Sequence, residues 1–212
     1  MLEKYEQFGI EKFLFEYPGI STTPSSVLGI FLRGTFNFTA ETDKRGTISD
    51  QYEIEILVPF NFPRSVPVVR EIRGKIPKNG DFHVNPDGSL CLGSPLRLLS
   101  LVNSNPNLVA FAEKCLIPYF YAVSIKLNYG DDFMFGELDH GNVGALEDYS
   151  LLLGLEEDSQ IIQAFQLMGL KKRVGNKKAC PCGCGKRLVR IPVKVATCSG
   201  RKLPLHRHHP TC

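Results

Sequence analysis

Apolar and polar residues alternate cleanly along residues 51–58, QYEIEILV. This period of two predicts a half-buried antiparallel strand. The positions that fall on its apolar side are Tyr52, Ile54, Ile56 and Val58. Residues 28–39 and the VVREI segment at 68–72 predict two further strands, and residues 40–50, AETDKRGTISD, predict a polar hairpin connection.

Helical periodicity appears on both sides of these strands. Residues 2–16 predict a first helix, and residues 106–127 a longer one. The apolar face of the longer helix consists of Leu108, Phe111, Ala112, Cys115 and Tyr119. A short helical turn is expected at 96–101, and two amphipathic helices at 143–154 and 156–169. Strands followed by helices indicate an α+β fold, not a doubly wound sheet.

Between the strands and the long helix lies a stretch without a regular pattern, residues 76–95. It follows a proline-rich corner, FNFPRSVP, and contains only Gly and Asn-Pro turns. A structureless loop of this length in a compact domain is usually functional. Cys91 lies in this loop between two leucines, and turn residues on both sides should hold it at the surface. It is the first candidate for chemistry; the alternative is a small buried hydrophobic residue.

Charge and cysteine content divide the chain into a body and a tail. Residues 171–212 contain twelve Lys or Arg and no Asp or Glu, whereas the rest holds 13 Lys or Arg against 22 Asp or Glu. Five of the seven cysteines also lie in this tail. An odd number of cysteines and a charged N-terminus predict a cytoplasmic protein with free thiols and metal ligands. No apolar run is long enough to span a bilayer, so no membrane partner is expected.

The tail has the residue types of a zinc site. A tetrahedral zinc ion takes four Cys or His ligands. The eight candidates, enough for one or two ions, are Cys180, Cys182, Cys184, Cys198, His206, His208, His209 and Cys212. One workable spacing uses Cys180, Cys182, Cys198 and His206. A structural zinc would supply folding energy to this segment; the alternative is a disordered basic tail in which the thiols happen to cluster.

The order of parts resembles the ubiquitin-conjugating enzymes, and most closely their divergent bacterial branch. That family has an N-terminal helix, an antiparallel meander, a proline-rich corner, and a His-Pro-Asn ahead of Gly-x-Ile-Cys-Leu. Its loop motif is echoed by His83, Asn85, Gly88, Leu90, Cys91 and Leu92. The resemblance implies a ubiquitin-conjugating-like domain over residues 1–155, a helix and basic linker over 156–178, and a Cys/His-rich tail over 179–212.

The resemblance also implies a mechanism. Cys91 would accept a ubiquitin-like modifier as a thioester from an activating enzyme and pass it to an amine of an acceptor protein. Asn85 would stabilise the oxyanion, or only shape its turn. His83 would transfer protons, or order the loop. His140, in the acidic segment GELDHG, would help the attacking amine lose its proton, or begin a helix. The transfer chemistry itself needs no cofactor.

Two other function classes compete with this interpretation. A non-catalytic relative would bind a modifier or peptide through the same fold, but such relatives typically lack the active cysteine. A nucleic-acid role for the basic tail lacks support, because the tail has no aromatic residue for base stacking and no helix-turn-helix pattern. Cys115, on an apolar helical face, is expected to be structural. A bacterial defence role would fit the branch, although no residue demonstrates it.

Overall fold

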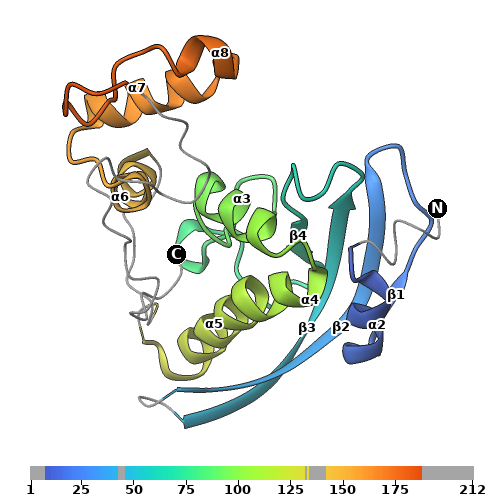
Figure 1. The fold of residues 1–212 in the computed structure, drawn as a ribbon. Coiled ribbons are helices and arrows are strands. Elements are labelled where there is room, and N and C mark those ends of the chain that lie inside the picture. The colour runs from blue at the N-terminus through green and yellow to red at the C-terminus, as the bar shows by residue number, and fades with distance from the viewer. Residues whose placement is uncertain (1–7, 43–45, 132, 134–141, 188–212) are drawn as a thin grey trace. The chain divides into compact units, whose positions relative to one another are not determined.

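A computed structural model describes residues 8–42, 46–131, 133 and 142–187 (Figure 1). These residues fall into two compact units, the first ending at 133 and the second covering 142–187. The first contains the sheet and the Cys91 loop, and the second contains the described part of the cysteine-rich tail.

The first unit is built on a four-stranded antiparallel sheet with the order β1-β2-β3-β4. Its strands are β1 (Ile20–Thr22), β2 (Gly29–Thr42), β3 (Gly46–Pro59) and β4 (Val68–Glu71). The four residues expected on the apolar side of β3 are all buried: Tyr52, Ile54, Ile56 and Val58. Together with the helices, this meander confirms a mixed α+β architecture.

The hairpin formed by β2 and β3 is longer than the sequence predicted. Residues 40–50 were expected to form a polar connection, but the strand ladder continues from Thr39–Ser49 to Thr42–Gly46. The extension is held by α5, where the Tyr121 hydroxyl lies 2.7 Å from Thr42 Oγ1 and donates to the Gly46 carbonyl at 3.2 Å. A polar composition misled the prediction because this part of the hairpin has a solvent-exposed outer face.

One helical run packs on the core side of the sheet (Figure 1). It consists of α4 (Leu108–Phe111), the π-helical segment η2 (Ala112–Leu116) and α5 (Ile117–Tyr129). All five residues of its predicted apolar face are buried. Among the described residues it is the one helix long and apolar enough to cross a membrane, but 78% of its apolar window is buried inside the protein. Two other helices are α2 (Ile10–Glu16) and α3 (Pro95–Ser104).

Aromatic rings join this helical run to the sheet. Phe36 of β2 stacks on Tyr17 with ring centroids 4.6 Å apart, and Phe120 of α5 stacks on Tyr52 of β3 at 4.5 Å. Phe36 and Phe120 are 5.6 Å apart, so the rings form a continuous row through the core. The Tyr52 hydroxyl, 2.7 Å from Ser124 Oγ, finds a polar partner despite its burial.

A polar network borders this aromatic row. The Asp50 carboxylate accepts hydrogen bonds from Lys75 Nζ at 2.5 Å, the Gln51 backbone N–H at 2.7 Å and Ser124 Oγ at 2.8 Å. Burial alone would raise the pKa of Asp50. The hydrogen bonds from Lys75, Gln51 and Ser124 outweigh it and hold this pKa below its usual value.

We expect acid to destabilise the first unit partly through Asp50. Because its pKa is lower in the folded state, the ionised carboxylate contributes stability above the unfolded pKa, and this is lost as pH falls through the folded pKa. Asp50→Asn should lower the free energy of unfolding at neutral pH by about 1–2 kcal/mol and flatten the pH dependence below about pH 4. Urea titrations at several pH values measure both effects. Glu41→Gln, at an exposed position of the same hairpin, is the control. An unchanged pH profile in Asp50→Asn would contradict the assignment.

The second unit is a small helical assembly. It contains α6 (Asn142–Leu153), α7 (Asp158–Met168) and the short helix α8 (Lys172–Gly175) within the segment predicted as a linker. Its buried core consists of Leu155, Ile161 and Ala164, against which pack Leu146, Tyr149, Leu153 and Cys182. Helix α6 thus packs with α7. The domain boundary at residue 155 stays a prediction.

Candidate functional site

The loop that carries Cys91 contains a tight hairpin. The Gly88 N–H donates to the Asn85 carbonyl at 2.8 Å, and the Asn85 N–H donates to the Ser89 carbonyl at 2.8 Å. The ring of Pro86 fixes φ at the second position of the turn. Gly88 has a φ of 79°, which residues with a side chain rarely adopt. The Asn-Pro-Asp-Gly sequence therefore closes a three-residue turn with a glycine bulge.

This hairpin is attached to the edge of the sheet. The Leu90 N–H donates to the Val69 carbonyl of β4 at 2.8 Å. Asp87 accepts from Arg70 Nη2 at 3.1 Å. Hydrogen bonds from the side chain and backbone of Ser89, with Arg70 nearby, lower the pKa of the exposed Asp87. An exposed ion pair stabilises little, but the backbone pairing extends the order of the sheet up to Cys91.

His83 is part of the framework of the loop. Its backbone has a φ of 51°, and its carbonyl accepts from the Cys91 N–H at 2.7 Å. The side chain is buried, and its ring meets Phe133 edge to face with centroids 4.5 Å apart. These contacts favour the loop-ordering alternative for His83; proton transfer by His83 stays a prediction.

A side chain of α5 holds the same loop from the other side. The Tyr119 hydroxyl donates to the Phe82 carbonyl at 2.8 Å. Lys126 lies about two helical turns after Tyr119. Its Nζ is 5.5 Å from the Phe82 ring centroid and 5.4 Å from that of Phe133. The residue before His83 is therefore fixed to the core helix.

We expect Tyr119→Phe to loosen the Cys91 loop without unfolding the protein. Loss of one partly buried hydrogen bond costs about 1 kcal/mol, which would raise the population of opened loop about fivefold. Hydrogen exchange at the Cys91 N–H and the rate of alkylation of Cys91 measure this opening. Tyr121→Phe, on the same helix but bonded to the far end of the β2–β3 hairpin, is the matched control. Equal rates in the two variants would refute the role of Tyr119.

Cys91 itself lies between two anchored elements. Its thiol is half-buried, and its neighbours Leu90 and Leu92 are buried in the core. Three residues further on, Ser94 caps α3 by accepting from the Arg97 N–H at 3.3 Å. The backbone on both sides of the thiol is thus held by hydrogen bonds to the sheet edge and to the start of α3.

Cys115 contrasts with Cys91. It is 3% exposed on the helical run, and burial raises the pKa of its thiol to about 12. A thiol in such surroundings is protonated at neutral pH and is a poor nucleophile. The prediction that Cys115 is structural agrees with this burial.

Two further residues were predicted to take part in the chemistry of Cys91, and the structure describes only one of them. Asn85 is exposed, and its side-chain amide donates to Ser89 Oγ at 3.0 Å, so in this structure it reinforces the turn. Its oxyanion role stays a prediction. His140 lies outside the described residues, as does the rest of its GELDHG segment.

The tail cysteines converge. The Sγ atoms of Cys180, Cys182 and Cys184 lie within 4.8 Å of one another and could hold a metal ion. The Sγ atoms of Cys180 and Cys182 are 3.1 Å apart. We call residues 180–184 the cysteine turn. The other five predicted ligands, Cys198, His206, His208, His209 and Cys212, lie outside the described residues.

The local backbone explains why the thiols meet. The Gly183 N–H donates to the Cys180 carbonyl at 3.3 Å, and the Cys180 N–H donates to the Lys186 carbonyl at 2.8 Å. Gly183 and Gly185 both have a φ of 73°, which glycine adopts at no steric cost. The alternation of cysteine and glycine therefore folds the chain back so that the sulfur atoms face a common point.

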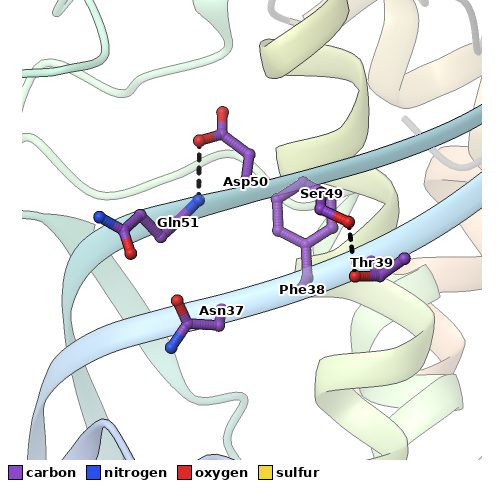
Figure 2. A pocket seen from close by; sticks show the side chains of 6 residues that line it. All are labelled: Asn37, Phe38, Thr39, Ser49, Asp50 and Gln51. Carbon is purple, nitrogen blue, oxygen red and sulfur yellow. Dashed lines mark hydrogen bonds between the residues drawn. The ribbon is translucent and has the colours of Figure 1, made fainter.

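A shallow hollow on the β2–β3 hairpin was not expected from the sequence (Figure 2). Its lining consists of Asn37, Phe38, Thr39, Ser49, Asp50 and Gln51. Thr39 Oγ1 lies 2.8 Å from Ser49 Oγ, and Asp50 belongs to the network described above (Figure 2). The hollow contains no thiol or imidazole, so it adds no candidate for the loop chemistry.

Comparison with known proteins gives no relative. No protein-family model matches this chain, and no curated protein or solved structure is significantly similar to it. The resemblance to ubiquitin-conjugating enzymes therefore depends on the loop motif and the order of elements alone. What supports a function is the geometry of the Cys91 loop and of the cysteine turn.

Proposed function

We propose that this protein is a ubiquitin-conjugating-like transferase that carries a ubiquitin-like modifier as a thioester on Cys91. The supporting observation is the presentation of Cys91. Its thiol is half-buried, its N–H is bonded to the His83 carbonyl, and it lies between a hairpin fixed to the sheet and the cap of α3. A carrier thiol needs such a position, because it must meet a donor enzyme and then an acceptor amine in a fixed orientation.

The proposed chemistry has two exchange steps. In the first, the Cys91 thiolate attacks the thioester carbonyl of the charged activating enzyme, and the thiol of that enzyme leaves. In the second, an acceptor amine attacks the carbonyl on Cys91, loses a proton, and releases the Cys91 thiolate as an amide forms. A thiolate suits both steps because it is a good nucleophile and a good leaving group.

The other loop residues would support these steps in different ways. His83 and the hairpin would fix the thiol, as their contacts indicate. Asn85 would donate to the oxyanion once its bond to Ser89 is exchanged for one to the substrate. His140 remains the candidate for assisting deprotonation of the amine. The partners are an activating enzyme, a modifier and an acceptor protein, in the cytoplasm and in a bacterial conjugation pathway of the defence type.

A non-reducing gel tests the proposal. The protein is mixed with ATP, a ubiquitin-like modifier and an activating-type enzyme that has been shown to charge that modifier. We expect a covalent adduct between this protein and the modifier, which disappears when a thiol reductant is added. A charged activating enzyme that yields no such adduct would favour the alternative, a module that binds a modifier or peptide without carrying it.

We further propose that the cysteine turn binds a structural zinc ion. Three converging thiolates match the soft ligands that zinc prefers, and a fourth would come from the remaining Cys or His residues of the tail. Cys182 also packs against the small core of the second unit. The buried hydrophobic residues described in this unit are few, namely Leu155, Ile161, Ala164 and Leu167. The ion would therefore supply folding energy that this small core lacks.

A further inference from the structure

Helix α7 carries two apolar stripes, of which the second unit covers one. Residues three apart lie on one side of a helix. The buried stripe consists of Ile161, Ala164 and Leu167. The residue after each of these is also apolar, and these three residues form a second stripe with the same spacing. They are Ile162, Phe165 and Met168, which are 53%, 37% and 43% exposed. The helix is thus apolar around more than half of its circumference, although only part of that surface is packed.

The uncovered stripe continues beyond the helix. Leu170 and Val174 are 41% and 42% exposed. We call Ile162, Phe165, Met168, Leu170 and Val174 the exposed strip. Phe165 is held in place by an edge-to-face contact with Tyr149 of α6, with centroids 4.8 Å apart. Five exposed hydrophobic side chains within 13 residues, on a helix and the segment that follows it, are typical of an interaction surface.

The two ends of the strip have opposite charge. At the start of α7, Glu156, Glu157 and Asp158 are all exposed. Past its end, the exposed charged residues are Lys171, Arg173, Lys177 and Lys178. The polar side of α7 between them is uncharged, with glutamine at positions 160, 163 and 166. The strip is therefore an apolar band with a negative end and a positive end.

We infer that the exposed strip pairs with the same strip of a second copy of this chain, with the two α7 helices antiparallel. A two-fold axis places the negative end of each helix against the positive end of its partner, and apolar side chains meet between them. The interface is self-complementary in charge as well as in hydrophobicity. This inference concerns the second unit alone and does not depend on the chemistry of Cys91.

Other occupants fit the charge pattern less well. Residues 188–212 contain five Lys or Arg and no acidic residue, so they have no group to meet the positive end of the strip. An anionic membrane or a nucleic acid would be attracted at one end and repelled at the other. A second copy satisfies both ends at once. The strip has five residues, far fewer than the roughly 20–30 a side of a standard interface, so we expect a weak dimer with a micromolar dissociation constant.

Sedimentation velocity of the full chain over a range of concentrations tests the inference, with reductant present so that disulfides cannot imitate the dimer. We expect a monomer–dimer equilibrium that Ile162→Asp shifts roughly tenfold or more toward monomer. Gln163→Asp adds the same charge on the polar side of α7 and should leave the equilibrium unchanged. Circular dichroism confirms that both variants retain their helices.

Substitutions that reverse a charge at one or both ends of the exposed strip distinguish a second copy of this chain from any other partner. Arg173→Glu alone, or Glu156→Lys alone, should weaken the dimer, because each lowers the opposite charge of the two ends. The two together should recover part of the loss, because the new Lys of one copy and the new Glu of the other again form a pair of opposite charge. Glu156 precedes α7, so its replacement leaves the helix intact. A monomeric wild-type protein at every accessible concentration, or a dimer insensitive to Ile162→Asp, would overturn the inference. So would a double reversal that weakens the dimer further.

Discussion

Replacing Cys91 by serine is expected to convert the thiol-sensitive adduct with the modifier into an adduct that resists reductants. A serine hydroxyl at this position can accept the modifier only as an oxygen ester, which thiols do not cleave readily. Cys91→Ala should abolish the adduct altogether, because no nucleophile remains. Non-reducing and reducing gels run in parallel distinguish the three outcomes, namely thioester, ester and none.

The second thiol of the first unit provides the matched control. Cys115 is buried, with a pKa raised to about 12, and should take no part in the exchange. Cys115→Ala removes only a sulfur atom from the core and should leave adduct formation intact, as should Cys115→Ser if the protein stays folded. An adduct that survives in Cys91→Ala, or that is lost in a folded Cys115→Ala protein, would show that Cys91 is not the carrier.

The sheet could be read from the sequence where one side of a strand is buried. The alternation at 51–58 predicted both the strand and the side of it that faces the core. All four residues predicted on that side are buried, namely Tyr52, Ile54, Ile56 and Val58. The same rule failed at 40–50, where Ala40 and Ile48 are the only two apolar residues and no alternation can be seen. Both are only partly buried in the structure. That part of the hairpin is held by Tyr121, 75 residues away from Gly46 in sequence, a contact that no local pattern contains.

The Cys91 loop shows the same division between local and distant information. The Asn-Pro-Asp-Gly turn is visible in the sequence, and the structure forms it with a glycine bulge at Gly88. The fixing of the loop is not visible, because Tyr119 lies 37 residues from its partner Phe82 and Phe133 lies still further from His83. Sequence spacing identified the thiol, but only tertiary contacts show how the loop around it is held.

Loss of the proposed zinc ion is expected to unfold the second unit and leave the first intact. The few buried hydrophobic residues described in this unit, Leu155, Ile161, Ala164 and Leu167, are too small a core to fold it. A structural zinc contributes roughly 10–16 kcal/mol in small zinc modules. Cys182→Ser should therefore remove the zinc and make residues 142–187 as sensitive to protease as an unfolded chain. Elemental analysis gives the zinc content, and hydrogen exchange followed by peptide shows where protection is lost.

The first unit is the control within the same molecule. Its core contains none of the three cysteines of the cysteine turn, so amides of α5 should stay protected after addition of a zinc chelator. Those of α6 and α7 should exchange rapidly, because Cys182 joins the cysteine turn to the α6–α7 core. Purified protein without bound metal, or α7 equally protected with and without the chelator, would mean that the helices of the second unit fold on their own and that the cysteine turn has another use.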